Sequence, residues 1–157
     1  MPVELVVLSR LFGYVAMRME AAFDRLLAPW ELHSWSWLAL MMVFSRGESD
    51  ITPTDISRAL FLARANVTRV TDELVRRGLL HREPSARDRR VLCLSLTEAG
   101  SALVEEILPK AWETHRAIWS GLDSAQLAGA QDLLSALAKG IESPVGASAP
   151  DLPKEKS

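Results

Sequence analysis

Residues 52–96 have the sequence TPTDISRALFLARANVTRVTDELVRRGLLHREPSARDRRVLCLSL, and this stretch decides the fold. It begins with a typical helix start. Thr52 can cap a helix, Pro53 suits the first helical position, and the carboxylate of Asp55 favours the positive end of the helix dipole. The opening residues therefore predict a short helix.

A second helix is expected from about residue 64 to residue 77, after a brief turn. Val67, Val70 and Leu74 recur at helical spacing and form an apolar seam on one face. Gly78 follows the last periodic residue, in the position where glycine commonly ends a helix. The two short helices and their tight turn resemble a helix-turn-helix.

Residues 79–83 and 91–96 are predicted to be two strands. The second strand alternates leucines with smaller residues, which indicates a strand buried on one face. The loop between them, residues 84–90, is short and cationic, and Ile51 suggests one further very short strand. A helix-turn-helix followed by a basic hairpin predicts a winged helix, whose second helix fits the DNA major groove.

Candidate DNA contacts follow from this geometry. Arginine can donate two hydrogen bonds to guanine, asparagine can pair with adenine, and threonine can meet a phosphate or a thymine methyl group. An arginine at the hairpin tip can enter the minor groove, where the potential is negative. The predicted contacts are Arg64, Asn66, Thr68 and Arg69 on the second helix and Arg87, Asp88, Arg89 and Arg90 in the wing.

The charge distribution supports a local polyanion site. The chain of 157 residues has a net charge of −2, but residues 58–90 carry nine arginines and four acidic residues, a balance of +5. The remainder therefore carries −7. A basic block within an acidic protein indicates a local site for a polyanion, and a solvated charged face is the alternative interpretation.

Amphipathic helices are expected on both sides of this lobe. We expect a mainly α protein with a small β-hairpin wing: a winged helix lobe over about 33–97, flanked by dimerisation helices over about 3–28 and 98–142. Together they form a single domain, 1–142. Residues 143–157 are rich in Pro, Ser, Ala and Lys without an apolar period, and are expected to be disordered.

Several segments also resemble the MarR family of transcription regulators. The matching segments are ISRAL at 56–60, VTRVTDELVRRGLL at 67–80, DRR at 88–90 and LTEAG at 96–100. The resemblance covers about residues 5–140. It implies a triangular dimer whose first and last helices interlock between subunits. It also implies that Arg90 reaches into the minor groove while Asp88 holds it.

Two positions depart from the family pattern. The family usually places Ser at the start of the recognition helix, where this chain has Ala63. An orphan backbone amide is then left for water or a DNA phosphate. His33 stands where the family often has a capping Thr, so Ser34 is expected to take over the cap.

A cluster of tryptophans before and within the helix that starts near residue 33 suggests a second site. Trp37 matches a common core position of the family. Members of this family often bind small aromatic acids between the dimer helices and the DNA lobe. Packing of the aromatics at the dimer seam is the simpler alternative. The candidate ligand residues are Trp30 and Trp35, with Arg18 or His33 as partner of a small aromatic carboxylate.

Other classes of chemistry lack support in the sequence. Cys93 is the single cysteine and is expected to be an ordinary strand thiol in a reducing compartment. The three histidines have no metal-ligand spacing, and no catalytic motif or cofactor motif is present. Charged residues interrupt the N-terminal 27 residues, and the longest apolar run is too short to span a bilayer. We therefore expect a cytoplasmic protein that is not an enzyme, uses no cofactor and has no membrane partner.

The sequence thus predicts a homodimeric, sequence-specific regulator that binds duplex DNA at a pseudo-palindromic operator. We expect a repressor that a small aromatic ligand releases from DNA. Two alternatives remain: a regulator or activator without a ligand, and a protein-interaction module that uses the winged fold without binding DNA.

Overall fold

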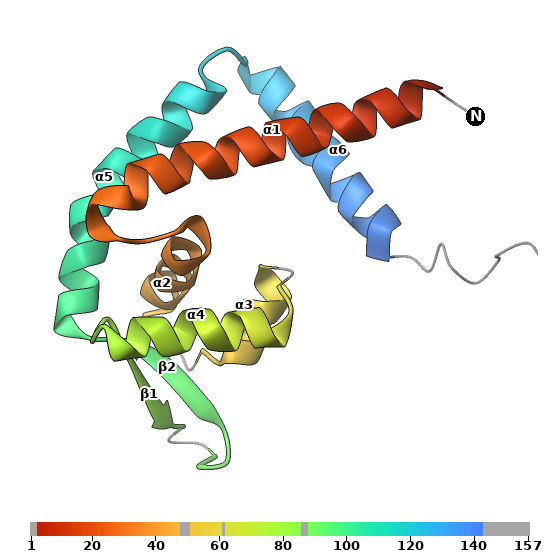
Figure 1. Cartoon of the computed structure of the whole chain (residues 1–157). Helices are drawn as coiled ribbons and strands as arrows, with labels where there is room; N and C mark the ends of the chain where they lie inside the picture. The colour runs from red at the N-terminus through yellow and green to blue at the C-terminus, as the bar shows by residue number, and fades with distance from the viewer. Residues whose placement is uncertain (1–2, 48–50, 61, 86–87, 143–157) are drawn as a thin grey trace, which may run out of the picture. The chain divides into compact units, whose positions relative to one another are not determined.

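The computed structural model describes residues 3–47, 51–60, 62–85 and 88–142, so the tail 143–157 expected to be disordered lies outside the described residues. The chain divides into two compact units, residues 1–118 and 119–157, which we treat separately. The elements, shown in Figure 1, are α1 (Val3–Leu27), η1 (Ala28–Trp30), α2 (Ser34–Arg46), α3 (Pro53–Ala59), α4 (Arg64–Arg76), β1 (Leu80–Pro84), β2 (Leu92–Leu96), α5 (Glu98–Trp119) and α6 (Ser124–Glu142).

Helix α2 is the centre of the first unit. It lies between α1 and α4 and packs against both (Figure 1). Trp37, Leu40 and Val43 are buried in the single hydrophobic core formed by the described residues. This burial confirms the core position expected for Trp37 and explains why α2 is apolar nearly all round.

Helices α3 and α4 form the predicted helix-turn-helix. The Thr52 hydroxyl accepts a hydrogen bond from the Asp55 amide at 3.1 Å, and the Asp55 carboxylate accepts one from the Thr52 amide at 2.9 Å. This reciprocal capping box fixes the start of α3. Val67 and Leu74 of α4 are buried. Gly78 has a φ of +70° just after the helix, where glycine adopts the left-handed conformation without strain.

Strands β1 and β2 form the predicted antiparallel hairpin, with Leu80 paired to Leu96 and Pro84 to Leu92. Ile51 forms an isolated bridge with Leu94, which confirms the short third strand. Leu94 is buried, whereas Leu92 is 47 % exposed at the far end of the hairpin. The leucine side of β2 is therefore buried towards the C-terminal end of the strand and exposed near the hairpin tip.

The cap of α2 differs from the expectation. The Ser34 hydroxyl does not accept a capping bond; it donates to the Asp24 carboxylate at 2.7 Å. The same carboxylate accepts the Ser34 amide at 2.8 Å. Asp24 of α1 is therefore the residue that caps α2. The expectation for Ser34 was wrong because the acceptor comes from another helix, ten residues earlier.

The second unit contains α6. Its start is fixed by a capping box, in which the Gln126 side chain accepts a hydrogen bond from the Asp123 amide at 2.9 Å and the Asp123 side chain accepts one from the Gln126 amide at 2.8 Å. The helix exposes large apolar side chains within its own unit, including Leu133, Leu137 and Ile141.

Candidate nucleic-acid interface

The first two turns of α4 present the predicted contact residues to solvent. Arg64, Asn66, Thr68 and Arg69 are all exposed, while Val67 between them is buried. The burial of Val67 holds the helix against the lobe and turns its neighbours outward. The Thr68 hydroxyl donates to the Arg64 carbonyl at 3.0 Å, so in this rotamer it offers DNA only its acceptor lone pairs and its methyl group.

The N-terminus of α4 has no side-chain cap. Ala63 at the cap position has a methyl group only, and its carbonyl accepts the amides of Asn66 at 2.9 Å and Val67 at 3.2 Å. The two amides before Asn66 point out of the helix end, as the orphan donors of any helix do. This end therefore carries partial positive charge that favours a phosphate.

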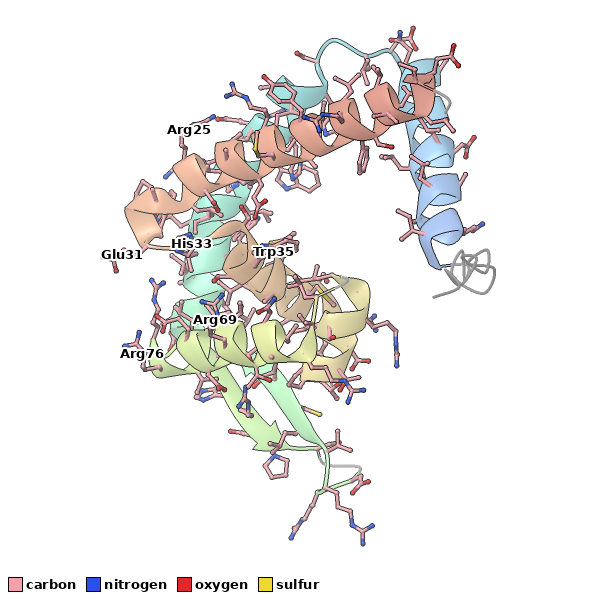
Figure 2. All side chains as sticks on the ribbon, turned by 45° about the vertical axis from the view of Figure 1, so that its right-hand side comes forward. Arg25, Glu31, His33, Trp35, Arg69 and Arg76 are labelled. Atoms are coloured by element: carbon pink, nitrogen blue, oxygen red, sulfur yellow. The ribbon has the colours of Figure 1, made fainter. Side chains whose placement is uncertain are left out.

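The acidic residues of α4 are compensated by arginines. Glu73 forms an ion pair with Arg76 at 2.6 Å, and Asp72 forms one with Arg82 of β1 at 2.6 Å. Arg69 belongs to no ion pair found among the described residues, so its charge is available to a ligand. Arg69 and Arg76 line the same shallow exposed face of α4, and Figure 2 labels both.

The hairpin tip carries the wing candidates. Asp88, Arg89 and Arg90 are exposed, and Arg87 lies outside the described residues. Asp88 accepts a hydrogen bond from the backbone amide of Arg90 at 2.9 Å. The carboxylate therefore shapes the turn that presents the Arg90 side chain, and the contact goes to the backbone of Arg90.

Sequence reasoning missed the contacts by which two arginines support the candidate interface. The Arg82 guanidinium donates to the Thr71 hydroxyl at 2.7 Å in addition to its ion pair with Asp72, and so ties the wing to α4. The Arg77 guanidinium donates to the carbonyls of Trp30 and Glu31, both at 2.7 Å, and so ties the end of α4 to the segment after α1. The sequence identifies both arginines only as members of the basic block, residues 58–90.

The four candidate ligand residues do not come together. A cavity of about 350 Å³ lies among α1, α2 and α5, and of the four only Trp35 lines it. Trp30 packs elsewhere: its indole N–H donates to Glu106 at 3.1 Å, and the Lys110 ammonium lies 4.4 Å from its ring centroid. Figure 2 shows His33 and Trp35 near the start of α2. Arg18 and His33 are exposed outside the lining.

His115 of α5 is the cavity histidine that sequence reasoning missed. Its ring centroid lies 4.6 Å from that of Phe23, and burial lowers the pKa of its imidazole below the ordinary value. The available signal was its position one helical turn after Ala111, which is buried in the core.

Two further findings concern metal binding and membrane crossing. Across the residues that the structure describes, no group of three or more His, Cys, Asp or Glu side chains could hold a metal ion. None of the described helices combines the length and the apolar character needed to cross a membrane.

Comparison with known proteins identifies the family. The model of the MarR family matches residues 32–91. The transcriptional repressor MprA of Escherichia coli is 31 % identical over 125 residues, which cover 80 % of this chain and 71 % of MprA. The chain belongs to the MarR family. The resemblance predicted from the sequence is therefore confirmed. MarR-family proteins are transcription regulators.

Solved MarR-family structures share the winged helix fold. A MarR mutant from E. coli complexed with operator DNA has a TM-score of 0.75 at 24 % identity, covering 85 % of this chain and 95 % of that one. BpsR of Bordetella bronchiseptica, whose DNA binding is regulated by 6-hydroxynicotinic acid, has a TM-score of 0.74 at 25 % identity, covering 83 % and 91 %. The predicted fold class is therefore confirmed.

Proposed function

We propose that this MarR-family chain is a transcriptional repressor that binds duplex DNA through α4 and the wing. The observation that carries the proposal is the exposed set on α4, where Arg64, Asn66 and Arg69 project from a helix held by the buried Val67. In this proposal α4 enters the major groove, and Asn66 and the arginines contact base edges or phosphates. Thr68 contributes its methyl group and lone pairs.

The wing supplies the second part of the proposed interface. Figure 1 shows the hairpin projecting beyond α4, so its tip can meet DNA next to the groove that α4 occupies. We assign Arg90 to the minor groove, Asp88 to the turn that presents it, and Arg87 and Arg89 to the adjacent phosphates. The operator complex of the E. coli MarR mutant supports this mode by its fold.

A salt series on a duplex selected from a random library tests the proposal. The affinity should fall steeply with salt, because each phosphate contact releases counterions, and the selected site should be pseudo-palindromic. The variant Arg69→Ala should weaken binding. Arg116→Ala, which removes an exposed arginine from α5, is the matched control and should bind like the wild type. Absence of duplex binding at low salt would favour the protein-interaction alternative.

We further propose that the chain acts as a homodimer. The N-terminal half of α1 exposes a row of apolar side chains, among them Val7 at 58 % and Leu11 at 56 %, and α6 exposes Leu133 and Ile141. Exposed apolar surface of this extent is unusual on a monomer, and a second copy would cover it. In this proposal residues 3–28 and 98–142 are the dimerisation helices and 33–97 the DNA lobe. Light scattering should give about twice the chain mass of 17.4 kDa.

A small aromatic effector is the third part of the proposal, and the cavity among α1, α2 and α5 is its site. The support is the aromatic lining of that cavity and the regulation of BpsR by 6-hydroxynicotinic acid, which is a precedent for the aromatic ring of the effector and not for its charge. A ligand that binds better to a lobe spacing unsuited to DNA lowers the affinity for DNA by its differential binding free energy. The alternative of a ligand-independent regulator or activator predicts no linkage between the two sites.

A further inference from the structure

The cavity among α1, α2 and α5 has the size and walls of a small-molecule site. Its volume of about 350 Å³ lies near the lower end of the roughly 300–1,000 Å³ typical of such sites. The aromatic lining comes from all three helices: Phe23 from α1, Trp35 and Trp37 from α2, and His115 from α5. Trp35 is 37 % exposed, so part of this lining residue is accessible to a ligand.

The charge around the cavity is negative. Its lining includes one formally charged residue, Glu20, and the ion pairs found among the described residues do not include it. The second titratable group of the lining is His115, and partial burial lowers the pKa of its imidazole, which disfavours the charged form. Asp24 adds a further carboxylate one helical turn after Glu20, where it binds the lining residue Ser34.

No cation compensates this charge within the lining. Arg18, expected from the sequence to face the ligand, is exposed outside the lining. His33, the second residue expected to face the ligand, is likewise exposed outside the lining. An anion in this cavity would therefore meet Glu20 without a positive partner.

We propose that this cavity binds a planar aromatic cation, with the ring between the aromatic walls and the charged nitrogen at Glu20. Aromatic faces attract cations through the ring quadrupole, so the walls and the carboxylate favour the same sign of ligand charge. The proposal deepens the effector site of the proposed function by naming its charge class, and it rests on that function only for the effect on DNA.

A matched pair of probes tests the charge class: 1-naphthylmethylammonium and 1-naphthoate, which have the same ring and opposite charges. Calorimetric titration of the full-length protein at pH 7 should show the ammonium binding at least roughly tenfold tighter than the carboxylate. Equal affinity, tighter binding of naphthoate, or binding of neither probe would overturn the proposal.

Variants of Glu20 and of a control residue test which carboxylate contacts the charged nitrogen of the probe. Glu20→Gln should remove most of the discrimination between the probes, by weakening the ammonium about two- to fivefold and by removing the repulsion of the carboxylate. It leaves intact the Glu20 backbone carbonyl that accepts the Ser34 hydroxyl at 3.3 Å. Glu4→Gln, an exposed carboxylate on the same helix, is the control and should keep the wild-type ratio. Unchanged discrimination in Glu20→Gln would refute the assignment of Glu20.

Two further measurements separate this proposal from the proposed function. Quenching of tryptophan fluorescence by the ammonium should be reduced in Trp35→Phe, where Trp37 remains as the second tryptophan of the lining, and retained in Trp30→Phe, because Trp30 does not line the cavity. Equal quenching in both variants would contradict the location. Duplex binding is measured on the same proteins without a probe, so a failure of DNA binding counts against the regulator and leaves the probe result to decide the cavity.

Discussion

Gly100 lies directly against the carbonyl group of Leu79. A Cβ atom built on Gly100 would be 2.1 Å from the Leu79 oxygen and 3.0 Å from the Leu96 side chain. The contact places the first turn of α5 on the strand connection, next to the Thr97 hydroxyl that caps the helix by accepting the Gly100 amide at 2.9 Å. The LTEAG segment is thus a close helix–strand junction that requires glycine at its last position.

Replacing Gly100 should therefore destabilise the fold. Gly100→Ala puts a methyl group into backbone that cannot move freely, and we expect a loss of about 1–3 kcal/mol or more in the free energy of unfolding. Gly129→Ala in α6 is the matched control, since nothing lies within 4 Å of its Cβ position and alanine favours a helix. Urea denaturation of both variants checks this, and equal stabilities would refute the close contact.

The Asp24 cap predicts acid sensitivity. The hydrogen bonds from Ser34 hold the pKa of the Asp24 carboxyl below its ordinary value of 3.8, against the opposing effect of burial. A carboxyl whose pKa is lower in the folded state contributes stability above the unfolded pKa and loses it as the pH falls through the folded pKa. Asp24→Asn should therefore lower Tm at pH 7, and the difference from wild type should shrink below about pH 4. A difference that is constant from pH 7 to pH 3 would exclude the ionised cap.

The winged helix lobe was predictable because its determinants are local in sequence. The Thr52 capping box and the glycine at residue 78 each act within a few residues, and the alternating leucines of β2 show which face is buried. The contacts of Arg77 reach carbonyls 46 and 47 positions away, and neither composition nor periodicity encodes such a pairing. The histidine of the cavity was missed for the same reason. His33 was the candidate because it is close to Trp35 in sequence, whereas His115 lines the cavity with Trp35 although it is 80 positions away.

The wing predictions concern Arg90 and Asp88. Arg90→Ala should weaken operator binding by about 1–3 kcal/mol with little change in Tm, as the loss of a specific groove contact does. Asp88→Ala should act in the same direction but less strongly, because the carboxylate shapes the turn through the Arg90 amide. Asp88→Asn keeps an acceptor oxygen and should bind more like wild type than Asp88→Ala does. Fluorescence anisotropy at physiological salt measures all three, and wild-type affinity for Arg90→Ala would remove the wing from the interface.

Asn66 and Arg69 should affect different quantities. Asn66→Ala should change the preference at particular base pairs, since an asparagine amide can pair with adenine. If Arg69 contacts a phosphate, Arg69→Ala should lower the slope of log affinity against log salt by roughly one and leave the preferred site unchanged. If it contacts a base, Arg69→Ala should instead change the preferred site. Selection from a random library gives the preference. Identical selected sites for Asn66→Ala and wild type would reject Asn66 as a base contact.

Arg77 and Arg76 are adjacent arginines whose removal should affect the stability of the fold to very different extents. The half-buried Arg77 donates to the carbonyls of Trp30 and Glu31, and Glu31 has the strained φ of +53° that this contact helps to hold. Arg77→Ala removes a charged donor from two carbonyls and should cost about 1.5–3 kcal/mol in the free energy of unfolding.

The neighbouring variant supplies the control for this last prediction. Arg76 forms an exposed ion pair with Glu73, and such pairs contribute little, so Arg76→Ala should leave Tm nearly unchanged. Arg77→Lys should recover only part of the loss, because a single ammonium cannot reproduce the planar fork that meets two carbonyls at 2.7 Å. Urea denaturation of the three variants and wild type measures these differences in the free energy of unfolding. Equal stabilities of Arg77→Ala and Arg76→Ala would show that the link between α4 and the segment after α1 contributes nothing to the fold.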